Sequence, residues 1–300
     1  MNRIVQVEGK EISISNPDKK LFPGVTKWDW ILHLSRLAPW ILSYARGRYL
    51  TTIRYPNGVE GDYFYQKNAP AHTPDWIQTA RWREVDHILL QDAPTLIWLG
   101  NLACLEFHVS FDRVERPGYP TELVFDLDPS VEGFEAVMET AHLTREVLNS
   151  LGLDGVVKTS GATGLQLYVP IQPKYPFAET RRISHFVARY LQEKNPRLIT
   201  LERQVKRRGS RVYFDYLQHW QGKSLITVYS PRARREATLS VPLRWEELKP
   251  GLTPTQFTLN TVHRRLKEAG DLFAPIARPV GAYDLSEILN FISRHEPEPV

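Results

Sequence analysis

The spacing of apolar and polar residues along the chain predicts a mixture of helices and strands. Apolar residues at helical intervals mark the expected helices: residues 27–44, a segment ending near Gly100, a segment between Ser130 and Gly152, residues 178–193 and residues 259–269. Shorter apolar or alternating segments mark the expected strands: residues 51–55, 63–65, 105–110, 123–128, 156–158, 165–171, 211–216 and 225–229. Because helices and strands do not alternate regularly as βαβ units, the pattern predicts an α+β fold rather than a doubly wound parallel sheet.

Polar and small residues mark where several of these elements begin and end. Thr26 is expected to cap the first helix, and Pro56-Asn57-Gly58 is expected to form a turn between two strands. Ser130 is expected to cap the helix that buries Phe134, and Gly152 is expected to end it.

Composition indicates an ordinary globular chain. Of its 300 residues, 42% are hydrophobic and 24% are charged. No apolar stretch approaches the roughly 20 residues that span a bilayer, and the first ten residues contain no apolar core of a secretory signal. The one cysteine, Cys104, lies in an apolar stretch, which fits a reducing compartment. We therefore expect a cytoplasmic protein without a membrane partner.

The basic residues are clustered. The net charge is only +4, but Arg203, Lys206, Arg207, Arg208 and Arg211 lie close together, and a second cluster contains Arg232, Arg234 and Arg235. Such clusters suit a polyanionic partner, and they equally suit a solvated surface. Charge alone leaves both interpretations open.

Two aspartates end the apolar run Leu123-Val124-Phe125-Asp126-Leu127-Asp128. In a strand, residues i and i+2 project from the same face, so Asp126 and Asp128 direct both carboxylates to one side. Adjacent carboxylates repel each other unless cations or protons lie between them, and hard divalent cations prefer oxygen ligands. The pair indicates a metal site for phosphoryl or nucleotidyl transfer, or else a solvated turn at the end of a strand.

A glycine-containing turn and a third aspartate add to this pair. The segment Ser160-Gly161-x-x-Gly164 joins two expected strands, and its amides and hydroxyls could cradle phosphate oxygens. It lacks the P-loop and dinucleotide-binding patterns, so on its own it favours a plain glycine hairpin. Asp215, within a hydrophobic strand, would complete a three-carboxylate cage able to hold two cations.

The order of these motifs resembles a known family. The Asp126-x-Asp128 strand, the Ser160-Gly161-x-x-Gly164 hairpin and the Phe214-Asp215-Tyr216 strand are followed by Tyr229-Ser230-Pro231-Arg232 and by a patterned segment from Ala237 to Leu248. This series resembles the polymerase (primase-polymerase) domain of bacterial ligase D, in the archaeo-eukaryotic primase superfamily. The resemblance covers essentially the whole chain.

The resemblance implies one domain over residues 1–300, with an archaeo-eukaryotic primase-like catalytic core made of mixed or antiparallel sheets flanked by helices. Its expected parts are a DNA-end-binding part over about residues 1–100, the core over about 101–250 and a helical part over about 251–300.

The resemblance also implies roles for particular residues. The metal ligands and catalytic carboxylates would be Asp126, Asp128 and Asp215, with two Mn²⁺ or Mg²⁺ ions. The nucleotide would be bound by His108, Ser160, Gly161, Gly164, Gln166, Lys223 and Arg232. The 5′-phosphate of the DNA and the template would be bound by Asn16, Lys19, Lys27, Phe64 and Tyr65.

Two positions depart from the family pattern. Gln166 stands where many relatives have histidine, which puts any proton transfer at this position in doubt, although glutamine can still donate a hydrogen bond. Thr163 stands where some members have a phosphate-contacting lysine, so binding of the triphosphate would depend more on Lys223 or Arg232.

The expected function is template-directed addition of ribo- or deoxynucleotides to a primer 3′-hydroxyl in non-homologous end joining. The expected partners are duplex DNA with a gap or break and a 5′-phosphate, nucleoside triphosphates, a separate DNA ligase and a Ku homologue, with the protein associated with the nucleoid. The alternatives are a primase that starts chains without a primer, a non-catalytic DNA-end-binding module and a metal-dependent nuclease. The chain has no Lys-x-Asp-Gly motif of a nucleotidyl-lysine ligase.

Overall fold

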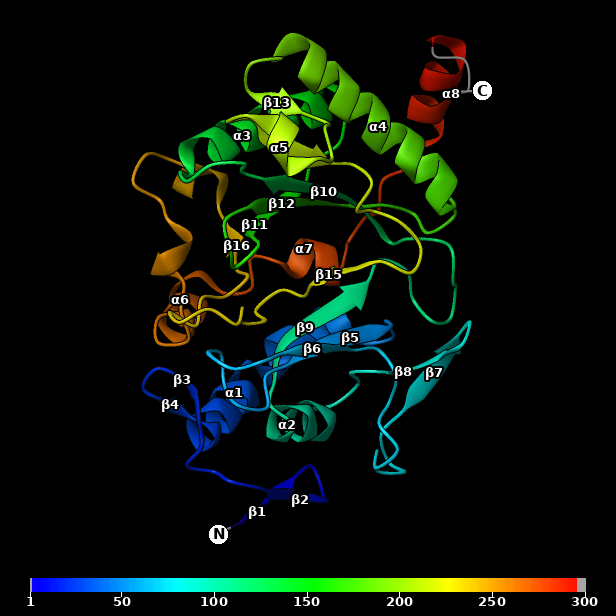
Figure 1. The fold of residues 1–300 in the computed structure, drawn as a ribbon. Coiled ribbons are helices and arrows are strands. Elements are labelled where there is room, and N and C mark those ends of the chain that lie inside the picture. The colour runs from blue at the N-terminus through cyan, green and yellow to red at the C-terminus, as the bar shows by residue number, and fades with distance from the viewer. Residues whose placement is uncertain (1, 296–300) are drawn as a thin grey trace. The chain divides into compact units, whose positions relative to one another are not determined.

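The computed structural model describes residues 2–295, which form two compact units (Figure 1). Unit 1 contains the chain up to Ser110 together with Ser224–Val241 and Pro254–Asp271. Unit 2 contains Phe111–Lys223, Pro242–Thr253 and the chain from Leu272.

The boundaries expected near residues 100 and 250 do not coincide with these units. Strand β15 (Ser224–Ile226) pairs with β9 (Cys104–Ser110) in unit 1, whereas β16 (Pro242–Leu243) pairs with β11 (Val156–Thr159) in unit 2. Pairing between segments distant in sequence therefore divides the expected core of residues 101–250 between the units. Residues 296–300 of the expected C-terminal helical part lie outside the described residues.

Unit 1 is built around a four-stranded antiparallel sheet and two packed helices. The sheet has the order β15-β9-β5-β6, with β5 at Leu50–Arg54 and β6 at Phe64–Gln66. The helices α1 (Lys27–Ala45) and α2 (Ala93–Asn101) pack against each other, and α2 also contacts β9. The remaining elements are three hairpins, β1 (Arg3–Val7) with β2 (Lys10–Ile14), β3 (Lys20–Phe22) with β4 (Val25–Thr26), and β7 (Thr79–Trp82) with β8 (Val85–Ile88), then the 3₁₀ turn η2 (Pro254–Gln256) and the helix α6 (Val262–Ala269).

The start of α1 is fixed by local hydrogen bonds. The Thr26 hydroxyl accepts from the Asp29 amide at 3.2 Å, and the Asp29 carboxylate accepts from the Thr26 amide at 2.9 Å, which is a capping box. Trp30, Leu34 and Ile41 then fall on one face of the helix and are fully buried. The predicted cap at Thr26 is confirmed.

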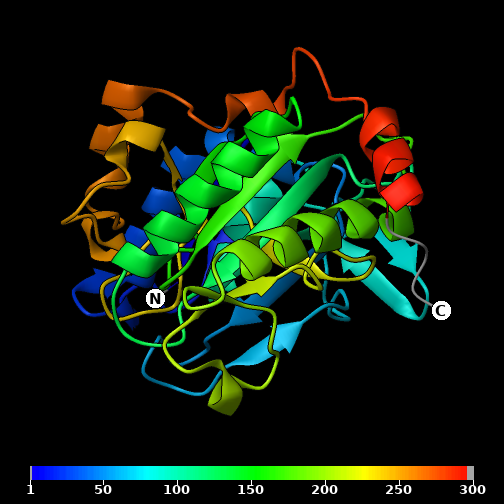
Figure 2. The same cartoon turned by 90° about the horizontal axis from the view of Figure 1, so that it is seen from above.

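Unit 2 contains a six-stranded sheet with the order β13-β14-β10-β12-β11-β16. Its neighbouring strands are antiparallel except for the parallel pair β13 (Ile199–Thr200) and β14 (Val212–Asp215). The helices α3 (Glu135–Ser150) and α4 (Phe177–Lys194) lie along the sheet, as the green and yellow-green ribbons of Figure 2 show. The central strands are β10 (Glu122–Asp128) and β12 (Leu165–Pro170), and the shorter helical elements are α5 (Val205–Arg208), η1 (Trp245–Glu247), α7 (Ala274–Ala277) and α8 (Ser286–His295).

The α+β class predicted from the sequence is confirmed, while some element boundaries are wrong. Ser130 does not cap α3, because the helix begins only at Glu135, beyond Gly133 with a φ of +122°; Phe134 is buried just before the helix. The strand expected over residues 225–229 ends at Ile226, and Tyr229 has a left-handed backbone with a φ of +61°. Among the described residues, no helix has the length and apolarity to cross a membrane.

Candidate active site

Strand register brings the three aspartates of the predicted cage to one face of the unit 2 sheet. In the antiparallel pair β10 and β14, Asp126 lies directly opposite Asp215, and Asp128 lies opposite Tyr213. Directly opposed residues project to the same face, as do residues two apart along one strand. Asp126, Asp128 and Asp215 therefore share a face near the end of β10, although about 90 residues separate Asp126 from Asp215 in sequence.

The three carboxylates repel one another in this arrangement. Asp126 is only 8% exposed, and burial, followed by the charges of Asp128 and Asp215, raises the pKa of its carboxyl group well above the usual range. A divalent cation would relieve this repulsion, and the ligands offered are the oxygens that such ions prefer.

The Asp215 carboxylate is also bound locally. Its Oδ1 accepts from the Leu217 amide at 3.0 Å. Burial and the Asp215 carboxylate raise the pKa of the Tyr213 hydroxyl. Across residues 2–295, no three side chains of His, Cys, Asp or Glu lie close enough together to hold a metal ion. The aspartates thus share a face without forming a closed set of ligands.

The Ser-Gly-x-x-Gly turn lies against the end of β10, where Asp126, Asp128 and Asp215 form what we term the carboxylate edge. The Ser160 hydroxyl accepts from the amides of Ala162 at 3.2 Å and Gly164 at 3.1 Å. Because two amides use its acceptor sites, the hydroxyl can act toward a ligand only as a donor, which suits a phosphate oxygen. A Cβ atom at Gly164 would lie 2.4 Å from the Leu127 carbonyl oxygen and 3.1 Å from Asp128 Oδ1. The second glycine is therefore required by contact with the aspartate strand.

Gln166 connects Asp126 to a buried lysine. It lies opposite Asp126 on β12 and is 2% exposed, and its Nε2 donates to Asp126 Oδ1 at 3.0 Å. Its Oε1 accepts from Nζ of Lys158, which is 0% exposed. The amide is thus held on both sides within the protein.

Two cations lie beside Asp215. Lys223 Nζ and Arg181 Nη2 both donate to the Leu217 carbonyl, at 2.8 Å and 3.1 Å. Burial lowers the pKa of Lys223, and the negative charge of Asp215 opposes this shift. The Arg181 guanidinium also stacks on the Trp220 ring at 3.5 Å.

In unit 1, the buried carboxylate of Glu106 contacts both residues expected to bind the triphosphate, His108 and Arg232. Glu106 Oε2 is 2.9 Å from His108 Nε2 and 3.2 Å from Arg232 Nη1, and Glu106 Oε1 accepts from the Ala233 amide at 3.0 Å. Burial alone would raise the pKa of Glu106, but the hydrogen bond with His108 and the charge of Arg232 outweigh it, so the pKa is lowered. Glu106 thus brings together the nitrogen donors of His108, on β9, and of Arg232, in the loop that follows β15.

The residues expected to bind a 5′-phosphate form a second cationic group in unit 1. Lys19 Nζ donates to Asn57 Oδ1 at 3.0 Å, and Lys27 Nζ donates to the Asn101 carbonyl at 2.9 Å. Lys27 is 4% exposed, and burial, then the charges of Lys19 and Arg54, lower its pKa. An anion bound among these cations would offset their mutual repulsion.

The other expected residues at this end are exposed. Asn16 has a left-handed backbone with a φ of +47°, and its carbonyl accepts from the Lys19 amide at 3.1 Å, which closes the turn. Phe64 and Tyr65 lie on the edge strand β6 and are 44% and 65% exposed. The Arg54 guanidinium lies 5.1 Å from the Phe64 ring centre. Exposed rings at a sheet edge can stack on bases.

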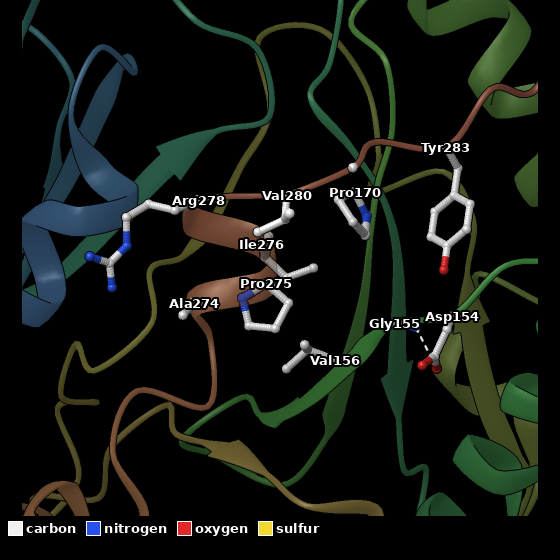
Figure 3. Close-up of a pocket in the computed structure, with 11 residues that line it drawn as sticks. Asp154, Gly155, Val156, Pro170, Ala274, Pro275, Ile276, Arg278, Val280 and Tyr283 are labelled. Atoms are coloured by element: carbon white, nitrogen blue, oxygen red, sulfur yellow. Dashed lines mark hydrogen bonds between the residues drawn. The ribbon is translucent and has the colours of Figure 1, made fainter.

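Two cavities lie outside the carboxylate edge. One of about 500 Å³ in unit 2 is lined by Val156, Pro170, Ile276 and neighbouring residues (Figure 3). Pro170 pairs with Glu122, at the opposite end of β10 from Asp128, so this apolar cavity is remote from the carboxylates along the strands. The other, about 350 Å³ in unit 1, is lined by Lys20, Asn57, Glu60 and Arg235 among others.

Sequence reasoning missed four residues that support the expected ones: Arg54, Glu106, Lys158 and Arg181. Glu106 and Lys158 carry a signal, because each is a charged residue within a segment otherwise expected to be buried, and a buried charge needs a partner. Arg54 and Arg181 resemble surface cations in the sequence, and only the fold places them beside Lys27 and Asp215.

Comparisons with known proteins agree on one family. The family model described as "LigD, primase-polymerase domain" matches residues 26–273. The chain is 37% identical over 288 residues to the bifunctional non-homologous end joining protein LigD of Bacillus subtilis (strain 168), covering 95% of this chain and 47% of that protein. It is 32% identical over 278 residues to the multifunctional non-homologous end joining protein LigD of Mycolicibacterium smegmatis, covering 89% of this chain and 36% of that protein.

A solved structure gives the same result. The polymerase domain of Mycobacterium tuberculosis ligase D, determined in complex with DNA, is 31% identical and matches with a TM-score of 0.83, covering 89% of this chain and 98% of that one. The chain thus spans less than half the length of these curated LigD proteins but nearly all of the isolated polymerase domain. It belongs to the family of LigD primase-polymerase domains, which are nucleotidyltransferases.

Proposed function

We propose that this chain adds ribo- or deoxynucleotides to a primer 3′-hydroxyl, directed by a template strand, at gaps and broken ends during non-homologous end joining. The observation that carries the proposal is the register that sets Asp126 opposite Asp215, with Asp128 two residues along, on one face. Family membership supports the reaction class, and the names of the relatives support the repair process.

The residues at the carboxylate edge fit a metal-dependent reaction. The family is metal-dependent, and Asp126, Asp128 and Asp215 would hold two divalent ions, Mn²⁺ or Mg²⁺. When bound, such ions lower the pKa of an attacking hydroxyl and offset the negative charge of a triphosphate.

The protein's own donors would orient the nucleotide. In unit 2, the turn from Ser160 to Gly164 would donate to phosphate oxygens beside the carboxylates, and Lys223 would supply positive charge near Asp215. In unit 1, His108 and Arg232 would donate to the triphosphate from positions fixed by Glu106. Donors fixed in this way orient a phosphate group without the cost of ordering mobile water.

The DNA end would be bound by unit 1. Lys19 and Lys27, with Asn16 nearby, would bind the 5′-phosphate, and Phe64 and Tyr65 would stack near the template. The DNA complex of the Mycobacterium tuberculosis polymerase domain supports DNA as the substrate. A separate DNA ligase, a Ku homologue and a nucleoid location complete the proposal.

Primer extension on a gapped duplex with a 5′-phosphate tests the proposal. We expect extension that requires Mn²⁺ or Mg²⁺ and accepts both nucleotide sugars, and we expect Asp126→Asn to reduce its rate at least about 100-fold. Asp154→Asn is the matched control, because Asp154 is an exposed aspartate of the same unit that lines the remote cavity. Normal extension by the Asp126 variant would contradict the assignment of the carboxylates.

Two further arms separate the alternatives. Synthesis from template and nucleotides without a primer would indicate a stand-alone primase. DNA-end binding without metal-dependent extension would indicate a non-catalytic end-binding module.

A further inference from the structure

Three buried polar side chains form a hydrogen-bonded series that runs from Lys158 to the carboxylate edge. Lys158 on β11 lies opposite Gln166 on β12, and Gln166 lies opposite Asp126 on β10. The Lys158 ammonium donates to Gln166 Oε1, and Gln166 Nε2 donates to Asp126 Oδ1 at 3.0 Å. Lys158 and Gln166 are 0% and 2% exposed, so water cannot readily replace either bond.

The ammonium at one end of this series and the carboxylate at the other fix the direction of its two hydrogen bonds. An ammonium group can only donate hydrogen bonds, and an ionised carboxylate can only accept them. The amide of Gln166 must therefore turn its oxygen to Lys158 and its NH₂ group to Asp126. Without the lysine, a glutamine could rotate its amide by 180° and present its oxygen to the carboxylate, which would repel it.

The positive charge of Lys158 also stabilises the Asp126 carboxylate, to which Gln166 donates a hydrogen bond. Asp126, Asp128 and Asp215 place three carboxyl groups on one face, and the buried ammonium of Lys158 is connected to Asp126 by two hydrogen bonds through Gln166. A buried ammonium among apolar residues is costly unless such partners compensate it, so its presence at this position calls for an explanation. Its ring contact with Tyr168, at 5.3 Å, lies on the same strand as Gln166.

From these contacts we infer that Lys158 is a positioning residue for the divalent-cation site: by orienting the Gln166 amide it holds Asp126 Oδ1, leaving the other carboxylate oxygen to bind a cation. The inference rests on the proposed function, which places the cation at Asp126, and extends it to a residue that does not touch the cation.

A titration of the full chain with Mn²⁺, without nucleotide, tests this role. Binding is measured as the decrease of the electron paramagnetic resonance signal of free Mn²⁺. We expect Lys158→Met and Gln166→Met each to weaken Mn²⁺ binding at least tenfold. Because the lysine acts through the amide, the double variant should bind no more weakly than Gln166→Met alone. Gln166→His should keep the affinity within about threefold, since its two ring nitrogens can accept from Lys158 and donate to Asp126.

The control removes the same charge elsewhere in unit 2. Lys194 is exposed at the end of α4, and Lys194→Met should leave Mn²⁺ binding unchanged. Wild-type affinity in Lys158→Met, or a loss that multiplies with that of Gln166→Met, would overturn the positioning role. If Lys158→Met does not fold, unchanged affinity in Gln166→Met would overturn it equally.

Failure of the proposed function would look different in the same experiment. If the wild-type chain binds no Mn²⁺, or if Asp126→Asn binds it as tightly as the wild type, then the carboxylate site itself is refuted together with the role of Lys158.

Discussion

The contact between the glycine turn and the aspartate strand predicts a large effect from one added methyl group. In Gly164→Ala, the new Cβ would lie 2.4 Å from the Leu127 carbonyl oxygen, where ordinary contacts are 3.4–4 Å, so one strand must move by about 1 Å. Overpacking of this kind costs about 1–3 kcal/mol of unfolding free energy. A displacement of about 1 Å at a catalytic group can reduce the rate about 100-fold.

A second glycine, which directly precedes a strand of the same sheet as Gly164 does, separates loss of stability from loss of the site. In Gly155→Ala, the Cβ would lie 2.5 Å from the Tyr168 carbonyl oxygen, on β12 but toward the end remote from Asp128. Urea unfolding should show similar losses of stability for both variants, whereas primer extension at equal folded fraction should fall about 100-fold only in Gly164→Ala. Equal activity of the two variants would refute the close fit of the turn against the carboxylate edge.

Three other predictions follow from the described contacts. Burial lowers the pKa of His219 to about 3, so the folded chain resists protonation of this side chain. Between pH 8 and pH 5, His219 alone should therefore lower the free energy of unfolding by about 2 kcal/mol. His219→Phe should reduce this pH dependence in urea titrations, and an unchanged pH dependence would contradict the lowered pKa of His219. Glu106→Gln weakens two charge-assisted contacts, so steady-state kinetics should show the nucleotide KM raised about fivefold or more with a smaller change in kcat, and an unchanged KM would argue against it. Lys19→Ala should remove the preference for a 5′-phosphorylated gap in a gel-shift titration, while Lys10→Ala, an exposed lysine on β2, should retain it; equal preferences in both variants would exclude this 5′-phosphate site.

Local signals in the sequence predicted much of the architecture. The helical period, the Thr26 cap and the glycine at 152 located α1 and the end of α3, because these features act over a few residues. The α+β class followed from the order of the elements. The predicted cap at Ser130 is wrong because serine is common both at helix N-termini and in loops. Gly133, with its positive φ, lies in the loop before α3, and the helix begins only at Glu135. The division into units was not predictable, since it depends on β15 and β16 pairing with distant strands.

The sequence predicts the common face of two candidate ligands, but it does not predict the residues that contact and support them. Asp126 and Asp128 stand two apart on one strand, so their common face follows from strand geometry alone. The position of Asp215 opposite Asp126 required the motif order of a family, because no local rule sets the register of strands so far apart. Glu106 and Lys158 act through hydrogen bonds across strands, which only the tertiary structure defines.

Crystals of the chain soaked with Mn²⁺ and a nucleoside triphosphate offer the sharpest test, because anomalous scattering at the manganese edge locates the metal directly. We predict manganese peaks within about 2.0–2.6 Å of carboxylate oxygens of Asp126, Asp128 and Asp215. Manganese bound elsewhere, with these three carboxylates lacking any peak, would contradict this prediction.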